Sequence, residues 1–97
     1  MIIQTQSIYV GENIAGWNLH TGSGDRAFDQ QIMFTTPFQA TPLVIVSMSR
    51  LDADKGFNTR VIVEAKNVTN VGFVLRTRAW ADTKLYSVGV SWLAHGN

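Results

Sequence analysis

Alternation of apolar and polar residues with a period of two is the feature that most restricts how this chain can fold. In the segment RVIVEAK, residues 60–66, Val61, Val63 and Ala65 fall on one face of an extended strand. Residues 73–80 alternate in the same way. No segment combines helical spacing with capping residues. Alternation of this kind is typical of strands that bury one face.

Two further segments, residues 28–34 and 86–92, show the same period. The residues expected to share one face in each are Phe28, Ile32 and Phe34, and Tyr86, Val88, Val90 and Trp92. Turn-forming residues separate the strands, at positions 11–13, 21–25, 52–56 and 67–70. About six short strands at even intervals predict an all-β fold, and we expect residues 1–97 to form a single six-stranded antiparallel β-sandwich domain.

One strand departs from this pattern. Residues 42–48, PLVIVSM, are apolar on both faces, whereas a strand in a two-layer sandwich has one core face and one outer face. An exposed apolar stripe is an association site unless something covers it. We therefore expect oligomerisation through this strand, and the alternative is a loop that folds over it.

The formal net charge of +1 excludes several classes of partner. It provides neither the basic surface of a nucleic-acid-binding protein nor a polybasic segment for membranes, so we expect no nucleic acid and no membrane insertion. Arg76, Arg78 and Trp80 on one strand face leave a single-stranded nucleic-acid binder as a disfavoured alternative. The first ten residues lack the basic and apolar regions of a signal peptide, which predicts synthesis in the cytosol and leaves non-classical release or release by lysis open.

Catalytic and metal-binding motifs are not found in the sequence. It contains no cysteine, and its two histidines, His20 and His95, have no partners at metal-ligand spacing. GSGDRA at 22–27 lacks the third glycine of a dinucleotide loop, and SVGVS at 87–91 is not a nucleophile elbow. DADKGFN at 52–58 has its glycine and glutamate out of place for an EF-hand, and a turn explains it better. We expect no enzyme activity, cofactor or metal.

A recognition surface is the remaining functional possibility. Arg60 opens one predicted strand, Trp80 closes another, Tyr86 opens the last, and Asp25 lies in a polar loop. An aromatic ring packs against the apolar face of a sugar, while arginine donates to its hydroxyl groups and a carboxylate accepts from them. From the pattern alone, cross-strand packing of Trp80 and Tyr86 is the more common explanation.

A set of short segments runs along nearly the whole chain in a characteristic order. The segments are Gly16-Trp17, Phe34, Pro37-Phe38, Pro42–Ser47, Leu51-Asp52, Asn58–Ile62, Gly72-Phe73, Trp80, Thr83-Lys84, Tyr86-Ser87 and Ser91-Trp92. In this order the set resembles the H-type lectin domain, known from snail agglutinins and from the C-terminal domains of discoidins. Each segment is weak alone, but the order of the set and its near-constant spacing from Phe34 onward are specific.

The resemblance implies a β-sandwich that assembles as a trimer, sometimes as two trimers back to back. It also implies metal-independent binding of N-acetylgalactosamine or galactose on glycoproteins or cell surfaces, at sites between subunits, so that the protein would act as a multivalent agglutinin. Arg60 matches the sugar-binding arginine of the family, and Trp80 and Tyr86 match the aromatics of its last hairpin.

The remaining ligands of the family come from the loop before the Phe34 strand. Gly24 and Asp25 fall in that loop, and Ser23 is the alternative by ungapped spacing. Some relatives carry a histidine after the hairpin tryptophan, where this chain has Ala81. The preference between galactose and N-acetylgalactosamine therefore stays open. So does the alternative of a structural or adhesive oligomerisation module with the same fold and no active sugar site.

Overall fold

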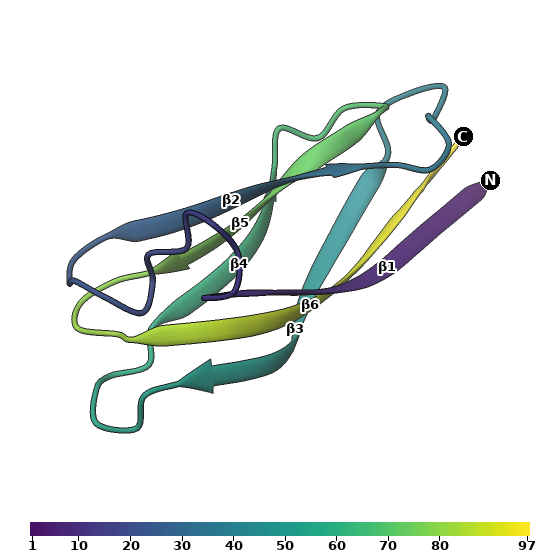
Figure 1. Cartoon of the computed structure of the whole chain (residues 1–97). Coiled ribbons are helices and arrows are strands. Elements are labelled where there is room, and N and C mark those ends of the chain that lie inside the picture. The colour runs from purple at the N-terminus through teal and green to yellow at the C-terminus, as the bar shows by residue number, and fades with distance from the viewer.

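The structure, a computed structural model, describes all residues 1–97 as two three-stranded antiparallel sheets packed face to face (Figure 1). One sheet has the strand order β1-β6-β3 and the other β2-β5-β4. The predicted all-β sandwich with six antiparallel strands is thus confirmed. No helix long and apolar enough to span a membrane is present. The strands are β1 (Ile2–Gly11), β2 (Arg26–Met33), β3 (Leu43–Ala53), β4 (Val61–Lys66), β5 (Gly72–Ala79) and β6 (Leu85–Gly96).

The two central strands, β5 and β6, supply most of the core because each lies between two neighbours. Alternate residues of β5 are buried from Phe73 onward, and alternate residues of β6 are buried from Val90 to Ala94, whereas residues 87–90 are buried in succession. Each fully buried large apolar side chain contributes about 1.5–3 kcal/mol to folding. The buried residues of these strands that face the interior are Phe73, Leu75, Thr77 and Ala79, and Leu85, Val88, Val90, Trp92 and Ala94. The period of two seen in the sequence therefore corresponds to burial in β5 and in the second half of β6.

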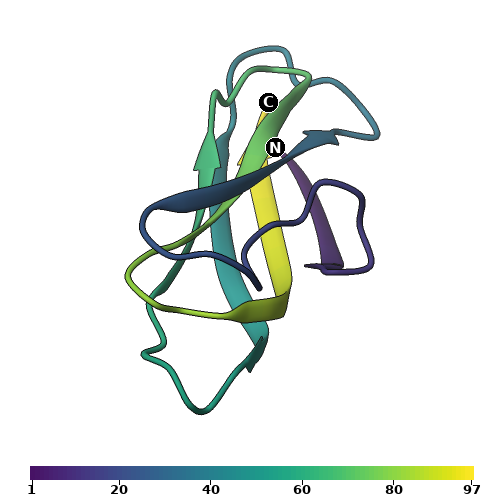
Figure 2. The same ribbon diagram turned by 60° about the vertical axis from the view of Figure 1, so that its left-hand side comes forward.

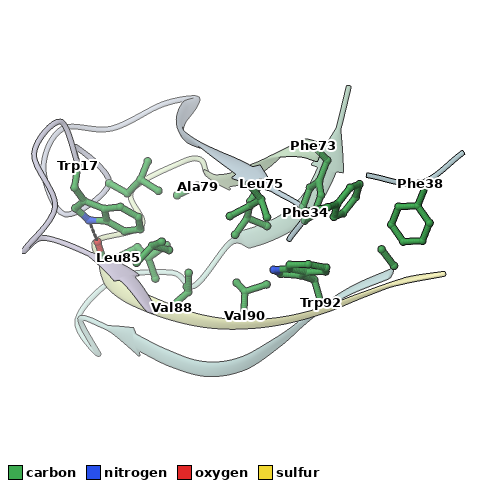
Figure 3. Close-up of a cluster of buried hydrophobic side chains, with 14 residues drawn as sticks. Trp17, Phe34, Phe38, Phe73, Leu75, Ala79, Leu85, Val88, Val90 and Trp92 are labelled. Carbon is green, nitrogen blue, oxygen red and sulfur yellow. Dashed lines mark hydrogen bonds between the residues drawn. The ribbon is translucent and has the colours of Figure 1, made fainter. Parts of the chain in front are cut away.

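Aromatic side chains fill the half of the core near the chain termini (Figure 3). Phe34, Phe38, Phe73 and Trp92 form a cluster whose ring centroids lie 5.0 to 5.9 Å apart in tilted or edge-on arrangements. Such geometries are the favourable ones for aromatic rings. At the other end of the core, the indole Nε1 of Trp17 donates to the carbonyl of Leu85 at 2.9 Å, which ties the long β1–β2 loop to β6.

Strand β3 is apolar on both faces, as the sequence indicates, and the two faces have different surroundings. Val44 and Val46 pack against the core. Leu43 and Ile45 point outward, with 59% and 56% of their surfaces exposed, so no loop of the chain covers them. In the strand register they share the outer face of the β1-β6-β3 sheet with Ile3 and Leu93. We call these four residues the apolar outer patch: Ile3, Leu43, Ile45 and Leu93.

Candidate functional site

Three loops gather at the end of the sandwich away from the two termini (Figures 1 and 2). They are the β1–β2 loop at 12–25, the β3–β4 loop at 54–60 and the β5–β6 hairpin at 80–84. Every candidate site residue of the sequence analysis belongs to these loops, except Tyr86, which lies just inside β6. We call this end of the molecule the loop end.

Strand register brings three of the candidates into one row. Arg26 of β2 pairs with Ala79 of β5, and Val61 of β4 pairs with the same Ala79. One step further along each strand come Asp25, Trp80 and Arg60. This row (Asp25, Trp80 and Arg60) therefore crosses the loop end of the β2-β5-β4 sheet, although the three residues are far apart in sequence.

A buried threonine fixes the position of the arginine in this row. Thr83 is fully buried, and its hydroxyl donates to the carbonyl of Asn58 at 2.7 Å while accepting from the backbone N–H of Arg60 at 2.9 Å. Asp82 adds a second tie, because its carboxylate accepts from both the backbone and the side-chain amide of Asn58. The guanidinium of Arg60 forms no hydrogen bond or ion pair within the chain and is free to take a ligand.

Arg26 organises the polar loop that carries the other candidates. Its guanidinium donates to the carbonyls of Gly24 at 2.9 Å and Thr21 at 2.8 Å, and more weakly to that of Ala81. The N–H of Gly24 also donates to the Ala81 carbonyl, at 2.8 Å, and Lys84 donates to the loop through its Nζ. Gly24 has a φ of +79°, in the left-handed region that glycine adopts readily. The loop is thus docked on the hairpin, with Gly24 held close to it.

Ser23, Gly24 and Asp25 are all exposed, and Asp25 makes no ion pair. Ala81 is exposed as well, and it has a φ of +59°, a conformation that costs an L-residue roughly 1–2 kcal/mol.

Tyr86 is oriented differently from what alternation predicts. Asp52 pairs with Ser87, but the next residue of β3, Ala53, pairs with Leu85, so Tyr86 is an extra residue in β6. The expectation that Tyr86 shares a face with Val88 is therefore wrong. The β-bulge changes the alternation, because it places Leu85 in the core and lets Tyr86 line a surface hollow.

This hollow, which we call the Tyr86 hollow, has a volume of about 220 Å³. It is lined by Tyr9, Glu12, Asn13, Asp52, Tyr86 and Ser87. The Tyr9 hydroxyl is hydrogen-bonded to that of Ser87 at 2.7 Å, and the guanidinium of Arg50 lies 4.7 Å from the centre of the Tyr9 ring. On the other side, His20 lies against Tyr86 with ring centroids 5.9 Å apart. The hollow lies next to the β1-β6-β3 sheet, whereas the row of Asp25, Trp80 and Arg60 ends the other sheet.

The charges on the outer face of the β2-β5-β4 sheet offset each other. Arg76 donates two hydrogen bonds to the carboxylate of Asp29, at 2.8 and 2.9 Å, and Glu64 pairs with Arg76 from the other side in the strand register. The hydrogen bond from Arg76 holds the pKa of Asp29 below its ordinary value, and the pKa of Arg76 is raised. This partial neutralisation removes much of the basic face that a nucleic-acid binder would need.

Sequence reasoning missed several residues that shape the loop end. Thr83 binds backbone groups of the β3–β4 loop, and Arg26 binds carbonyls of its own loop and of the hairpin, and no motif marks such roles. Glu12 and Asp52 reach the hollow only because the β1 and β3 strands flank the bulged start of β6. A turn signal was the indication at Glu12, and at Asp52 a turn signal and the match of Leu51-Asp52 to the lectin family, and neither assigned a binding role.

Comparisons with known proteins agree with the fold. The profile of the H-type lectin domain matches residues 29–95. The chain is 37% identical over 82 residues to "ATP synthase subunits region ORF 7" of Fuscovulum blasticum, covering 84% of this chain and 71% of that protein. It is 33% identical over 88 residues to a discoidin-1 of Dictyostelium discoideum, covering 90% of this chain and 34% of the discoidin.

Among solved structures, wild-type discoidin II of Dictyostelium discoideum superposes with a TM-score of 0.87 at 22% identity, over 99% of this chain and 37% of that one. Recombinant discoidin II gives a TM-score of 0.85, also at 22% identity, over 96% of this chain and 36% of that one. The chain therefore spans about a third of the discoidins that it matches. The discoidin II structures establish the likeness of fold, and the profile match over residues 29–95 establishes the family. The chain belongs to the H-type lectin domain family.

Proposed function

We propose that the protein is a multivalent lectin that recognises terminal N-acetylgalactosamine or galactose without a metal ion. Family membership supports carbohydrate binding, and the observation that carries the proposal is the row of Asp25, Trp80 and Arg60. An arginine with free donors, an exposed carboxylate and an aromatic ring are the groups that a galactose-type sugar needs. Arg60 donates to ring hydroxyls, Asp25 or its neighbour Ser23 accepts from them, and Trp80 forms an apolar wall.

The sugar sites lie between subunits in this proposal. Tyr86 belongs to the Tyr86 hollow beside one sheet, whereas Arg60 and Trp80 stand at the end of the other. A sugar that touches Tyr86 of one protomer can meet Arg60 of its neighbour when two copies stand side by side. The apolar outer patch supports such an assembly, because exposed apolar residues on a sheet face are stabilised when another copy covers them.

Assembly as a trimer, or as two trimers back to back, raises the apparent affinity of the sites for a glycan-coated surface. A single shallow sugar site binds with a Kd on the order of 0.1–1 mM. Several sites that face one glycan-coated surface raise the apparent affinity by about 10²–10⁴-fold. The apolar outer patch is therefore part of the binding function, because it holds the sites together.

Red-cell agglutination with sugar inhibition tests the proposed function. We expect agglutination at micromolar protein that N-acetylgalactosamine or galactose inhibits and glucose does not, both with and without a chelator. Titration calorimetry with the free sugars gives the affinity of one site. A protein that forms oligomers but neither agglutinates cells nor gives heat with either sugar would instead be a structural module that has the fold without the sugar site.

Replacing Ile45 with glutamate tests the assembly. Ile45 is 56% exposed, so its removal leaves the core intact, but a charge within the apolar outer patch opposes association. We expect Ile45→Glu to sediment as a monomer, and Ile62→Glu, the same change on the outer face of the other sheet, to sediment like the wild type. Unchanged sedimentation of Ile45→Glu would exclude this patch as the interface.

A further inference from the structure

Of the residues that line the Tyr86 hollow, only Tyr86 is among the proposed sugar contacts, so the hollow has no role yet in the proposed lectin site. Its volume of about 220 Å³ suits one sugar ring better than a drug-sized ligand, whose pockets span about 300–1,000 Å³. We propose that the hollow binds the second unit of a glycan whose terminal sugar occupies the lectin site, and that Glu12 and Asp52 exclude second units that carry a negative charge. The inference rests on the proposed lectin function.

Two irregularities in strand pairing build this hollow. Ser49 is an extra residue in β3, as Tyr86 is in β6. The first bulge places Arg50 opposite Gly89. Because Gly89 has no side chain, the side chain of Arg50 can lie across β6 and reach the Tyr9 ring. The second turns Tyr86 outward. Bulges of this kind often stand next to binding sites because they reorient side chains.

Tyr86 connects the hollow to the proposed lectin site. It is the one residue that belongs both to the candidate sugar contacts and to the lining of the hollow. A terminal sugar that packs on Tyr86 therefore directs its linked neighbour toward Tyr9 and Asp52. The two binding surfaces are continuous through a single aromatic ring.

The lining favours a neutral ligand rich in hydroxyl groups. The side chains of Glu12, Asn13 and Asp52 and the hydroxyl of Tyr86 form no hydrogen bond within the chain, so all four can bind a ligand. The two carboxylates accept hydrogen bonds from paired sugar hydroxyls, and the tyrosine rings offer apolar contact.

The same carboxylates penalise an acidic unit. No basic residue belongs to the lining, and the guanidinium of Arg50 lies over the Tyr9 ring. A ligand carboxylate about 6 Å from both Glu12 and Asp52 loses about three- to tenfold in affinity, depending on salt screening. Repulsion of an unwanted ligand is a common source of specificity.

Four galactosides test this inference by calorimetry on the assembled protein. The affinities for galactose and lactose compare one sugar unit with two. Lactitol and lactobionate keep the terminal galactose and differ at the end of the second unit, which is an alcohol in lactitol and a carboxylate in lactobionate. We expect lactose and lactitol to bind at least threefold more tightly than galactose, and lactobionate to bind three- to tenfold more weakly than lactitol at low salt.

The double variant Glu12→Gln, Asp52→Asn should bind lactitol and lactobionate equally and should bind galactose like the wild type. Glu64→Gln on the other sheet is the matched control and should keep the discrimination. If galactose binds but the disaccharides gain nothing and the double variant changes nothing, the inference is wrong and the lectin function stands. If no galactoside binds, the proposed function fails, and the inference fails with it.

Discussion

Replacement of Thr83 by valine is a direct test of how the loop end is held together. Thr83 is fully buried, and valine has nearly its shape, so the change removes one hydroxyl without opening a cavity. Two hydrogen bonds are lost, one to the carbonyl of Asn58 and one from the N–H of Arg60. At about 0.5–1.5 kcal/mol each, the free energy of unfolding should fall by about 1–3 kcal/mol.

Urea unfolding followed by tryptophan fluorescence measures this loss at a fixed protein concentration. The matched control is Thr77→Val, because Thr77 is 1% exposed and no hydrogen bond of its side chain is observed. The control should be neutral or slightly stabilising. We also expect Thr83→Val to weaken sugar binding, since Arg60 loses its anchor. If Thr83→Val is no less stable than Thr77→Val, the hydrogen-bond account of the loop end is refuted.

Three further predictions concern stability. The Asp29–Arg76 pair lowers the pKa of Asp29, so its contribution to the free energy of unfolding is present above the ordinary aspartate pKa and is lost as the pH falls through the lowered value. Asp29→Asn should therefore reduce the loss of stability at acid pH, and an unchanged acid limb of the stability–pH curve would contradict this. Ala81→Gly should relieve left-handed strain and raise the urea midpoint, whereas a lowered midpoint would count against strain. Gly72→Ala should lower the free energy of unfolding by more than about 2 kcal/mol, since the Cβ of the new alanine would lie 2.2 Å from the Ile32 carbonyl oxygen. Thermal melting measures the loss, and an unchanged melting temperature would mean that β2 shifts to make room.

The fold was predictable from the sequence because its strands alternate regularly. Val61, Val63 and the buried residues of β5 follow a period of two, and turn residues mark the strand ends. Strand pairing was not predictable from alternation, because it depends on contacts between residues that are distant in the chain. The row of Asp25, Trp80 and Arg60 follows only from the pairing of β5 with both β2 and β4.

The bulge at Tyr86 shows where alternation fails. One extra residue reverses the alternation, so Leu85 is buried and Tyr86 lines the hollow, and nothing in the sequence LYSVGV marks this change. The resemblance to the lectin family identified Tyr86 as a candidate, but its orientation required the structure. The roles of Arg26 and Thr83 were missed for a related reason, because their partners are backbone carbonyls: Arg26 donates to Thr21 in its own loop and to Ala81 in the hairpin, and Thr83 donates to Asn58.

The affinity of the Arg60→Ala variant for N-acetylgalactosamine tests the central claim most directly. Calorimetry on the assembled wild-type protein should give a Kd on the order of 0.1–1 mM. Removing the guanidinium loses charge-assisted hydrogen bonds of about 1.5–3 kcal/mol, which weakens binding at least tenfold. Arg76→Ala, farther along the same sheet, should bind like the wild type, and both variants should keep the wild-type sedimentation. Arg60→Ala that binds the sugar with undiminished affinity would contradict the assignment of the site.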